Sequence, residues 1–151
     1  MFGAAIEVEF CTIRRLVQRY NYIAMDTEFH CVIAQHVRKF KSLIDYQYQA
    51  LRCNVDSFKI IQAGLSFFDK NGNKPEGLST WQFNFKFCLS RDVFAQDSIN
   101  FLVRAGVMFR RHKEEGIEEF EFAQLLMTSG LVFSDEVKWL TFHSATTSVT
   151  C

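Results

Sequence analysis

Asp26 and Glu28 are the two residues of this sequence whose type and spacing best suit chemistry. In a β-strand, side chains two residues apart project from the same face, roughly 6.5–7 Å apart along the chain. Two carboxylates held in this way repel each other unless a cation lies between them or one of them is protonated. Oxygen ligands on a rigid strand suit Mg²⁺ or Mn²⁺, so the pair predicts a divalent-cation site.

The spacing of this pair also has a less specific interpretation, because acidic residues often occur at the solvated end of a strand. The residues before the pair favour a site: the apolar stretch 20–25 predicts a buried strand that ends at Asp26-Thr27-Glu28. Proteins of the α/β class bind ligands at such strand ends. Two divalent ions about 3.5–4 Å apart hydrolyse phosphodiesters, one by activating water and the other by stabilising the leaving oxygen.

The elements that must position this pair form a mixed α/β pattern in the order helix, strand, helix, strand, strand, helix, helix, strand. Periodicity predicts helices over 7–19, 46–55, 98–105 and 118–129, and strands over 20–25, 58–68, 81–87 and 137–142. Ser98 is expected to cap the third helix, with Gly106 ending it and Gly130 ending the fourth. Phe122, Leu125 and Leu126 should form the buried stripe of that fourth helix.

The second and third strands are expected to form an antiparallel hairpin, because an Asn71-Gly72 turn signal separates them. The third strand alternates with period two, which places four aromatic residues on one face: Trp81, Phe83, Phe85 and Phe87. Such a row could stack nucleic-acid bases. A buried sheet face is the favoured interpretation, since aromatic side chains are usually part of the core.

Composition predicts one soluble intracellular domain. The chain of 151 residues has 17 basic and 17 acidic residues, so its bulk charge gives no sign of nucleic-acid binding. Its 17 Phe and single Pro favour a large sheet covered by helices. The five cysteines form no C-x-x-C pair, which suits a reduced compartment. No signal sequence and no apolar segment of membrane-spanning length is expected, so no membrane association is predicted.

Several blocks of the sequence resemble, in order, one family: the DEDD-superfamily mRNA deadenylases of the CAF/POP type, the nuclease subunit of the CCR–NOT complex. The resemblance extends over residues 9–144. The matching blocks are RYNYIAMDTEF (19–29), DYQYQALRCNVDSFKIIQAGLSF (45–67), STWQFNFKF (79–87), AQDSI (95–99), EEGIEEFEFAQLLMTSG (114–130) and VKWLTFHS (137–144).

The resemblance implies an RNase H-like fold of the DEDD exonuclease type, with a mixed sheet flanked by helices. It also implies a poly(A)-specific 3′-5′ exoribonuclease that shortens mRNA poly(A) tails and releases AMP, using two Mg²⁺ (or Mn²⁺) ions. Asp26 would contact both ions and Glu28 one of them. The helix matching 123–130 would contact a NOT-type scaffold subunit, with Met127 as an exposed apolar contact. Family members act in the cytoplasm and nucleus, and the same is expected here.

The sequence departs from the family after Ser144, where the family continues into Y-D-F-G-Y-L with a second catalytic Asp, followed later by a His and a final Asp. Here Ala145 begins a Ser/Thr-rich tail over 145–151. We therefore expect a partial RNase H-like domain over 1–144, truncated after the fourth strand, with an apolar sheet face left uncovered. The 151 residues alone should show no deadenylase activity. The alternatives are a non-catalytic fragment that binds the scaffold and competes with the active subunit, and an unstable fragment with no role.

Other polar groups have a favoured structural interpretation beside a functional one. His30-Cys31 replaces a Pro-Gly of the family, and His30 is expected to be a loop histidine and not a ligand. His143 is expected to be structural, and Asn54 and Asp56 to cap helix ends. The stretch 110–113, Arg-Arg-His-Lys, could bind phosphates, but a surface turn neutralised by the following glutamates is favoured.

Overall fold

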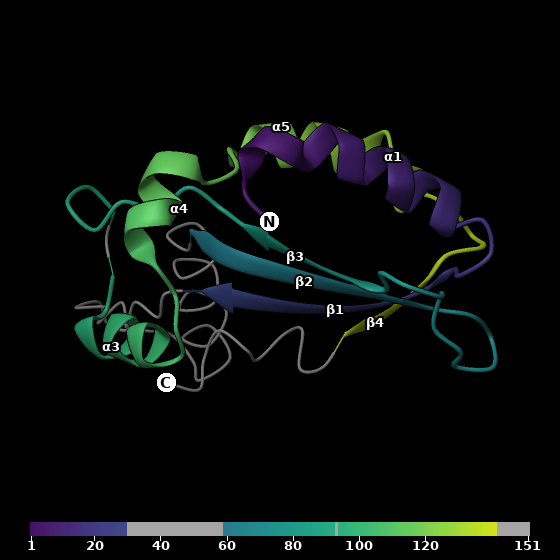
Figure 1. Cartoon of the computed structure of the whole chain (residues 1–151), viewed down its shortest axis with the longest axis horizontal. Helices are drawn as coiled ribbons and strands as arrows, with labels where there is room; N and C mark the ends of the chain where they lie inside the picture. The colour runs from purple at the N-terminus through teal and green to yellow at the C-terminus, as the bar shows by residue number, and fades with distance from the viewer. Residues whose placement is uncertain (30–58, 93, 142–151) are drawn as a thin grey trace, which may run out of the picture.

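The structure, a computed structural model, describes residues 1–29, 59–92 and 94–141. Its centre is a four-stranded mixed sheet in the order β3-β2-β1-β4 (Figure 1). β1 pairs antiparallel with β2, which pairs antiparallel with β3, whereas β4 runs parallel to β1. The strands are β1 (Tyr22–Phe29), β2 (Ile60–Phe68), β3 (Thr80–Asn84) and β4 (Lys138–Thr141). The predicted α/β class, the hairpin and the last strand are thereby confirmed.

Two helices, α1 (Ile6–Leu16) and α5 (Glu119–Met127), cover one face of this sheet (Figure 1). α1 buries Phe10 and Ile13 against the sheet, and Phe122 of α5 meets the Phe10 ring edge-on at 5.6 Å between centroids. Leu125 and Leu126 pack on the same core, which confirms the predicted stripe of α5. Alternate strand residues complete this core: Ile23, Ala63, Leu65, Phe67, Trp81 and Phe83.

The opposite face of the sheet carries small and polar side chains in its middle. Because the ladder partners of β1, β2 and β3 share a face, the register collects these residues on it: Ala24, Asp26, Glu28, Gln62, Gly64, Ser66, Thr80, Gln82 and Asn84. The expectation of an uncovered apolar face is therefore wrong for this middle part of the described sheet, whereas Tyr22, Phe68 and Leu140 lie on the same face towards its other end. Phe67 and Phe83 lie on the helix-covered face, and Phe87 lies beyond the end of β3.

The row of aromatic residues is buried, as the favoured interpretation predicted, and does not form a stacking platform. Trp81, Phe83, Phe85 and Phe87 are each 2% exposed or less. The four rings do not share one surface, however, because β3 ends at Asn84. Phe87 belongs to a second apolar cluster, which it forms with Ile61, Ile99, Leu102 and Phe109.

α3 (Gln96–Arg104) and α4 (Phe109–Glu115) supply the helical part of this second cluster. α3 begins after Ala95, so the prediction that Ser98 caps it is wrong by three residues. Gly106 and Gly130 have positive φ, 94° and 79°, as expected after helix ends. α4 was not predicted, because its sequence FRRHKEE is almost entirely charged, although Phe109 and His112 give it a buried side at helical spacing.

Some predictions lie outside the described residues: the helix over 46–55, the interpretations of His30-Cys31, Asn54, Asp56 and His143, and the tail over 145–151. Within the ranges that the structure describes, no helix is long and apolar enough to cross a membrane.

Candidate metal and nucleotide site

Asp26 and Glu28 lie on the polar face of β1 and line a pocket of about 270 Å³. β1 continues to Phe29, one residue beyond the predicted strand end at Asp26-Thr27-Glu28, so the pair lies in the last part of the strand. Their common face follows from the alternation of the strand, which turns Met25 and Thr27 the other way. The pocket is lined by Asp26, Glu28, Gln62, Gly64, Thr80, Trp81 and Gln82.

The register of the sheet explains why the pocket is open beside Asp26. The residue paired with Asp26 on β2 is Gly64, which has no side chain to fill that place. A Cβ atom added to Gly64 would lie 3.8 Å from the Asp26 carbonyl oxygen, an ordinary contact, so the backbone does not require glycine there. The absent side chain instead leaves room over the middle of the sheet for a ligand.

Two polar pairs border this opening. On one side, the Ser66 and Thr80 hydroxyls are 2.8 Å apart and hydrogen-bonded. On the other side, Gln62 Nε2 donates to Asn84 Oδ1 over 2.7 Å. The pocket therefore has hydrogen-bonding groups along its rim and carboxylates at one wall.

The electrostatics of the pair indicate a place for positive charge. Partial burial raises the pKa of the Glu28 carboxyl, and the negative charge of Asp26 raises it further. Asp26 Oδ1 accepts a hydrogen bond of 3.0 Å from the Thr27 backbone N–H, which holds one oxygen in place. A cation between the two groups would remove their repulsion and offset the cost of partial burial.

The donor set fits a hard divalent cation. Both residues supply carboxylate oxygens, and the other residues that line the pocket include two amides, Gln62 and Gln82, and one hydroxyl, Thr80. In the described part of the chain no group of three or more His, Cys, Asp or Glu side chains comes together. Asp26 and Glu28 therefore supply two oxygen ligands, and the remaining coordination positions must be filled by other oxygens.

Met127 lies at the C-terminal end of α5 and is 56% exposed, as predicted for a residue off the buried stripe. Phe120 of the same helix is 74% exposed. α5 therefore carries two large apolar side chains that are open to solvent.

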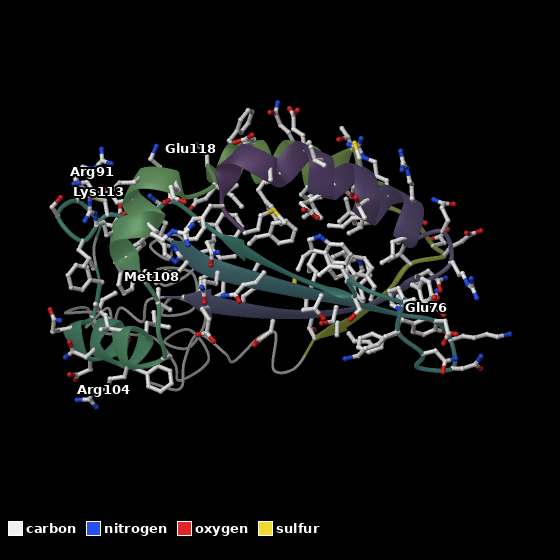
Figure 2. The ribbon with its side chains drawn as sticks, in the orientation of Figure 1. Glu76, Arg91, Arg104, Met108, Lys113 and Glu118 are labelled. Carbon is white, nitrogen blue, oxygen red and sulfur yellow. The ribbon has the colours of Figure 1, made fainter. Side chains whose placement is uncertain are left out.

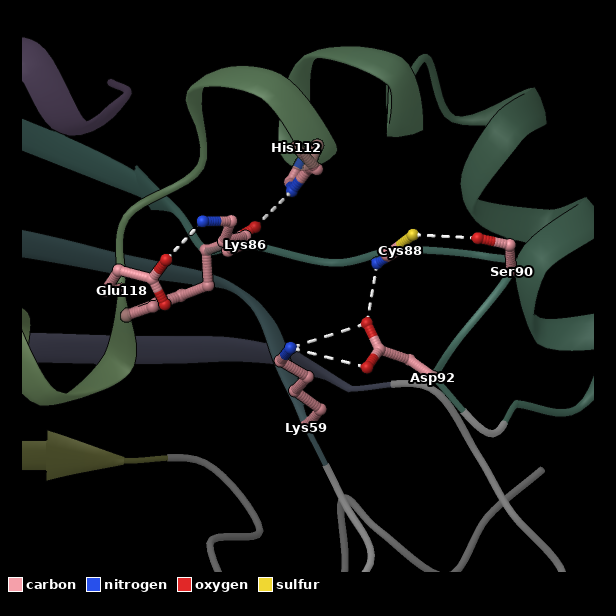
Figure 3. Close-up of polar contacts among 8 residues, drawn as sticks. Lys59, Lys86, Cys88, Ser90, Asp92, His112 and Glu118 are labelled. Carbon is pink, nitrogen blue, oxygen red and sulfur yellow. Dashed lines mark hydrogen bonds and ion pairs between the residues drawn. The ribbon is translucent and has the colours of Figure 1, made fainter.

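The basic stretch 110–113 is a helix and not the predicted surface turn, but its predicted neutralisation is confirmed. Arg110 pairs with Glu114 and Arg111 with Glu115 along α4. His112 was expected on the surface with its neighbours and is only 1% exposed. Its Nδ1 donates to the Phe85 carbonyl over 2.9 Å, which joins α4 to the segment after β3 (Figure 3).

A polar cluster separate from the carboxylate pair fixes the segment after β3 (Figure 3). Asp92 accepts from the Cys88 backbone N–H at 2.6 Å and pairs with Lys59 at 3.4 Å. Lys86 pairs with Glu118 at the start of α5. Arg91 and Lys113 lie close to this end of the molecule and Arg104 lies on α3, whereas Glu76 lies at the opposite end (Figure 2). These contacts join neighbouring elements, and none of the residues that make them lines the pocket of Asp26 and Glu28.

Sequence analysis identified the acidic pair but missed the rest of the pocket: Gln62, Gly64, Thr80 and Gln82. The signal was the alternation of β2, in which Gln62, Gly64 and Ser66 fall on one face. That signal becomes informative only when the register brings those residues beside Asp26 and Glu28.

Residues 4–125 match the family model described as CAF1 family ribonuclease. The chain is 50% identical over 144 residues to the poly(A) ribonuclease pop2 of Schizosaccharomyces pombe. This alignment covers 95% of this chain and 43% of the relative. It is 47% identical over 138 residues to poly(A) ribonuclease POP2 of Saccharomyces cerevisiae, covering 91% of this chain and 32% of the relative. The chain therefore spans less than half the length of these relatives.

Solved structures of such proteins have the same fold. The S. pombe Pop2p structure with Mg²⁺ and Mn²⁺ bound matches with a TM-score of 0.89 at 49% identity, over 95% of this chain and 57% of that one. The RNase domain of yeast Pop2 matches with a TM-score of 0.82 at 42% identity, over 96% and 53%. CAF1 co-crystallised with the yeast NOT1 MIF4G domain matches with a TM-score of 0.77 at 42% identity, over 96% and 53%.

Proposed function

The chain belongs to the CAF1 family of ribonucleases, and on that premise we propose that it supplies the first carboxylate pair of a divalent-cation-dependent 3′-5′ exoribonuclease acting on poly(A) tails. The observation that carries this proposal is the position of Asp26 and Glu28 on one face of β1, at a pocket whose floor is opened by Gly64. The relatives named poly(A) ribonuclease support the choice of substrate.

Asp26 and Glu28 would hold the cation, and the S. pombe structure with Mg²⁺ and Mn²⁺ supports that kind of ion. Such an ion, when bound, activates water and stabilises the charge that develops on the phosphate. The chain's own contribution is geometric: β1 fixes both carboxylates on one face, and the Thr27 N–H holds an oxygen of Asp26. The hydroxyl and amide groups of Thr80 and Gln82 would contact the 3′-terminal nucleotide in the pocket.

We further propose that two ions would be needed for hydrolysis and that Asp26 and Glu28 would be among the residues that hold them. A single pair of carboxylates suffices for weak binding of one ion, because Mg²⁺ and Mn²⁺ keep part of their hydration shell in such sites. It does not suffice for a pair of ions, whose like charges must be balanced by more carboxylates. The 151 residues alone are therefore expected to bind a cation without releasing AMP from oligo(A), since ligands of one site act as a unit.

A chimera tests this proposal. Residues 1–141, which end with β4, would be joined to the part of the S. pombe pop2 protein that follows its matching strand, and mixed with oligo(A) RNA in Mg²⁺ or Mn²⁺. We expect AMP release by the chimera and none by the 151-residue chain. Asp26→Asn should lower the chimera's rate by about 10³-fold or more. A folded but inactive chimera, or AMP release by the 151 residues near the chimera's rate, would contradict the proposal.

A second proposed function is binding of a NOT-type scaffold through the exposed side of α5. It is favoured by the exposure of Met127 and Phe120, and by the CAF1 structure solved with the NOT1 MIF4G domain. Capture of the chain on an immobilised MIF4G domain should be lost in Met127→Arg. Val103→Arg, at a site on α3 that is 54% exposed, is the matched control and should retain binding. Equal capture of both variants would exclude Met127 from the interface.

This binding would allow the 151 residues to compete with a complete nuclease subunit without catalysing hydrolysis. On the same premise we propose that the protein acts in the cytoplasm and the nucleus, which imaging of a tagged chain would test.

A further inference from the structure

Gln62 lines the pocket beside the acidic pair, and among the residues that the structure describes only the nitrogen of its side-chain amide is hydrogen-bonded. It is the ladder partner of Glu28 on the adjacent strand, so their Cβ atoms are about 4.5–5.5 Å apart. Gln62 Nε2 donates to Asn84 Oδ1 over 2.7 Å. Within the described residues, Asn84 is the only hydrogen-bond partner of the Gln62 side chain.

The orientation of the Gln62 amide follows from the donors and acceptors behind it. Asn84 is 6% exposed, and its Nδ2 donates to the Met1 carbonyl over 2.8 Å. Because a carbonyl oxygen can only accept, Asn84 must turn its nitrogen to Met1 and its oxygen to Gln62. Gln62 must therefore donate to Asn84 from its amide nitrogen, Nε2. Its oxygen, Oε1, is left as an acceptor on a residue that lines the pocket.

A divalent cation on Asp26 and Glu28 would need such an acceptor. The two carboxylates leave most coordination positions to water, and water molecules polarised by a dication are strong hydrogen-bond donors. The pocket of about 270 Å³ that Gly64 lines is where this hydration shell would lie. A Gln62 amide turned the other way would instead present N–H groups towards the cation, which is unfavourable.

We propose that Gln62 is a positioning residue of the metal site: its amide oxygen, oriented by the Gln62–Asn84–Met1 relay, accepts hydrogen bonds from the hydration shell of the cation held by Asp26 and Glu28. This inference rests on the proposed function, because it needs a cation at the carboxylate pair. It adds a residue that is neither acidic nor a direct ligand of the ion.

The test measures binding of Mn²⁺ alone to the 151-residue chain, by the loss of the electron paramagnetic resonance signal of free Mn²⁺. Gln62→Leu removes the acceptor and should weaken binding about 10-fold, as the loss of an outer-sphere partner of a metal site does. Gln62→Glu keeps the size and adds an acceptor with negative charge, so it should bind Mn²⁺ at least as tightly as the unchanged chain. If Gln62→Leu fails to fold, Gln62→Glu still tests the proposal. Weaker Mn²⁺ binding by Gln62→Glu than by the unchanged chain would overturn it.

Two further variants separate the relay from a general effect on the fold. Asn84→Ala frees the Gln62 amide to turn and should weaken binding by less than Gln62→Leu. The double variant should bind no more weakly than Gln62→Leu alone, because Asn84 acts through Gln62. Gln96→Leu is the matched control, since it breaks another Gln–Asn hydrogen bond, the 3.0 Å bond to Asn100 on the exposed side of α3.

Binding by Gln62→Leu within twofold of the unchanged chain would overturn this inference and leave the proposed function intact. Equal weakening by Gln96→Leu would also overturn it, because the effect would not belong to the pocket. No Mn²⁺ uptake by the unchanged chain would contradict the proposed function and this inference together.

Discussion

Asp26 and Glu28 impose a cost on the fold that a ligand would remove. They share one face of β1, and both burial and the charge of Asp26 raise the pKa of Glu28. A carboxyl whose pKa is raised by folding stabilises the protein at low pH, and this stabilisation is lost as the pH rises through the raised value. At neutral pH the ionised pair therefore opposes folding. Natural sequences keep such conflicts where function requires them.

The first prediction concerns Glu28→Gln. Without divalent ions at pH 7, the variant should unfold about 1–3 °C higher than the unchanged chain, because one repelling charge is gone. In Mn²⁺ the order should reverse, since the variant has lost a ligand. Thermal unfolding in EDTA and in Mn²⁺ measures both. Glu76→Gln, at the other end of the molecule, should change neither value (Figure 2), and a lower unfolding temperature of Glu28→Gln in EDTA would contradict the account.

How much of the site could be predicted differs from residue to residue. The spacing of Asp26 and Glu28 was sufficient, because alternation along a single strand depends only on local sequence. Gln62 and Gly64 could not be assigned in that way, because their place beside the pair depends on the pairing of β1 with β2. A shift of one residue in that register would turn Gln62 and Gly64 to the other face.

At the scale of elements, α4 shows where sequence periodicity was insufficient. The charges of 110–115 suggested a turn, but Phe109 and His112 are buried and fix the helix against the segment after β3. The ends of α3, α5 and β2 were predicted within a few residues because their apolar patterns are longer. Short elements such as α4 owe their position to tertiary contacts, and these contacts cannot be deduced from the local sequence.

Gly116, which follows α4, gives the second prediction. A Cβ atom there would overlap the His112 carbonyl oxygen and would lie 2.5 Å from Lys86 Cα and 2.6 Å from Lys86 N, closer than real contacts allow. Gly116→Ala should therefore lower the free energy of unfolding by about 3 kcal/mol, measured by urea denaturation. Gly3→Ala is the control, because the nearest atom would be at an ordinary 3.5 Å. Similar stabilities of the two variants would show that α4 does not approach Lys86 as described.

The third prediction is a pH dependence set by α4. Burial lowers the pKa of His112, and so do the positive charges of the Met1 amino group and Arg111, against the opposing effect of its hydrogen bond to the Phe85 carbonyl. The unfolded chain then binds a proton that the folded chain does not. Stability from His112 is therefore complete above its ordinary pKa of about 6.5 and is lost as the pH falls below it.

Below pH 6.5 the slope of this loss has a maximum of about 1.4 kcal/mol per pH unit for one proton. Urea denaturation at several pH values measures it. His112→Asn can keep a donor to Phe85 but does not titrate, so its stability should depend less on pH over this range. An unchanged slope in the variant would assign the acid sensitivity to other groups.

At the scale of the whole molecule, the sheet separates two tasks. One face packs on α1 and α5, whose outer side exposes Met127 and Phe120, and the other carries the polar pocket with Asp26 and Glu28 (Figure 1). A scaffold bound at Met127 would therefore leave the pocket face accessible. The class of fold was predictable from composition and from the order of elements, whereas the polar character of the second face was not, because it depends on register.

The central claim is that Asp26 and Glu28 hold a divalent cation, and calorimetric titration of the chain with Mn²⁺ tests it most directly. The unchanged chain should bind one ion, and Asp26→Asn should abolish the heat of binding. Asp97→Asn, an exposed carboxylate at the start of α3, should titrate like the unchanged chain. Retention of full binding by Asp26→Asn, or its equal loss in Asp97→Asn, would contradict the assignment of the site to this pair.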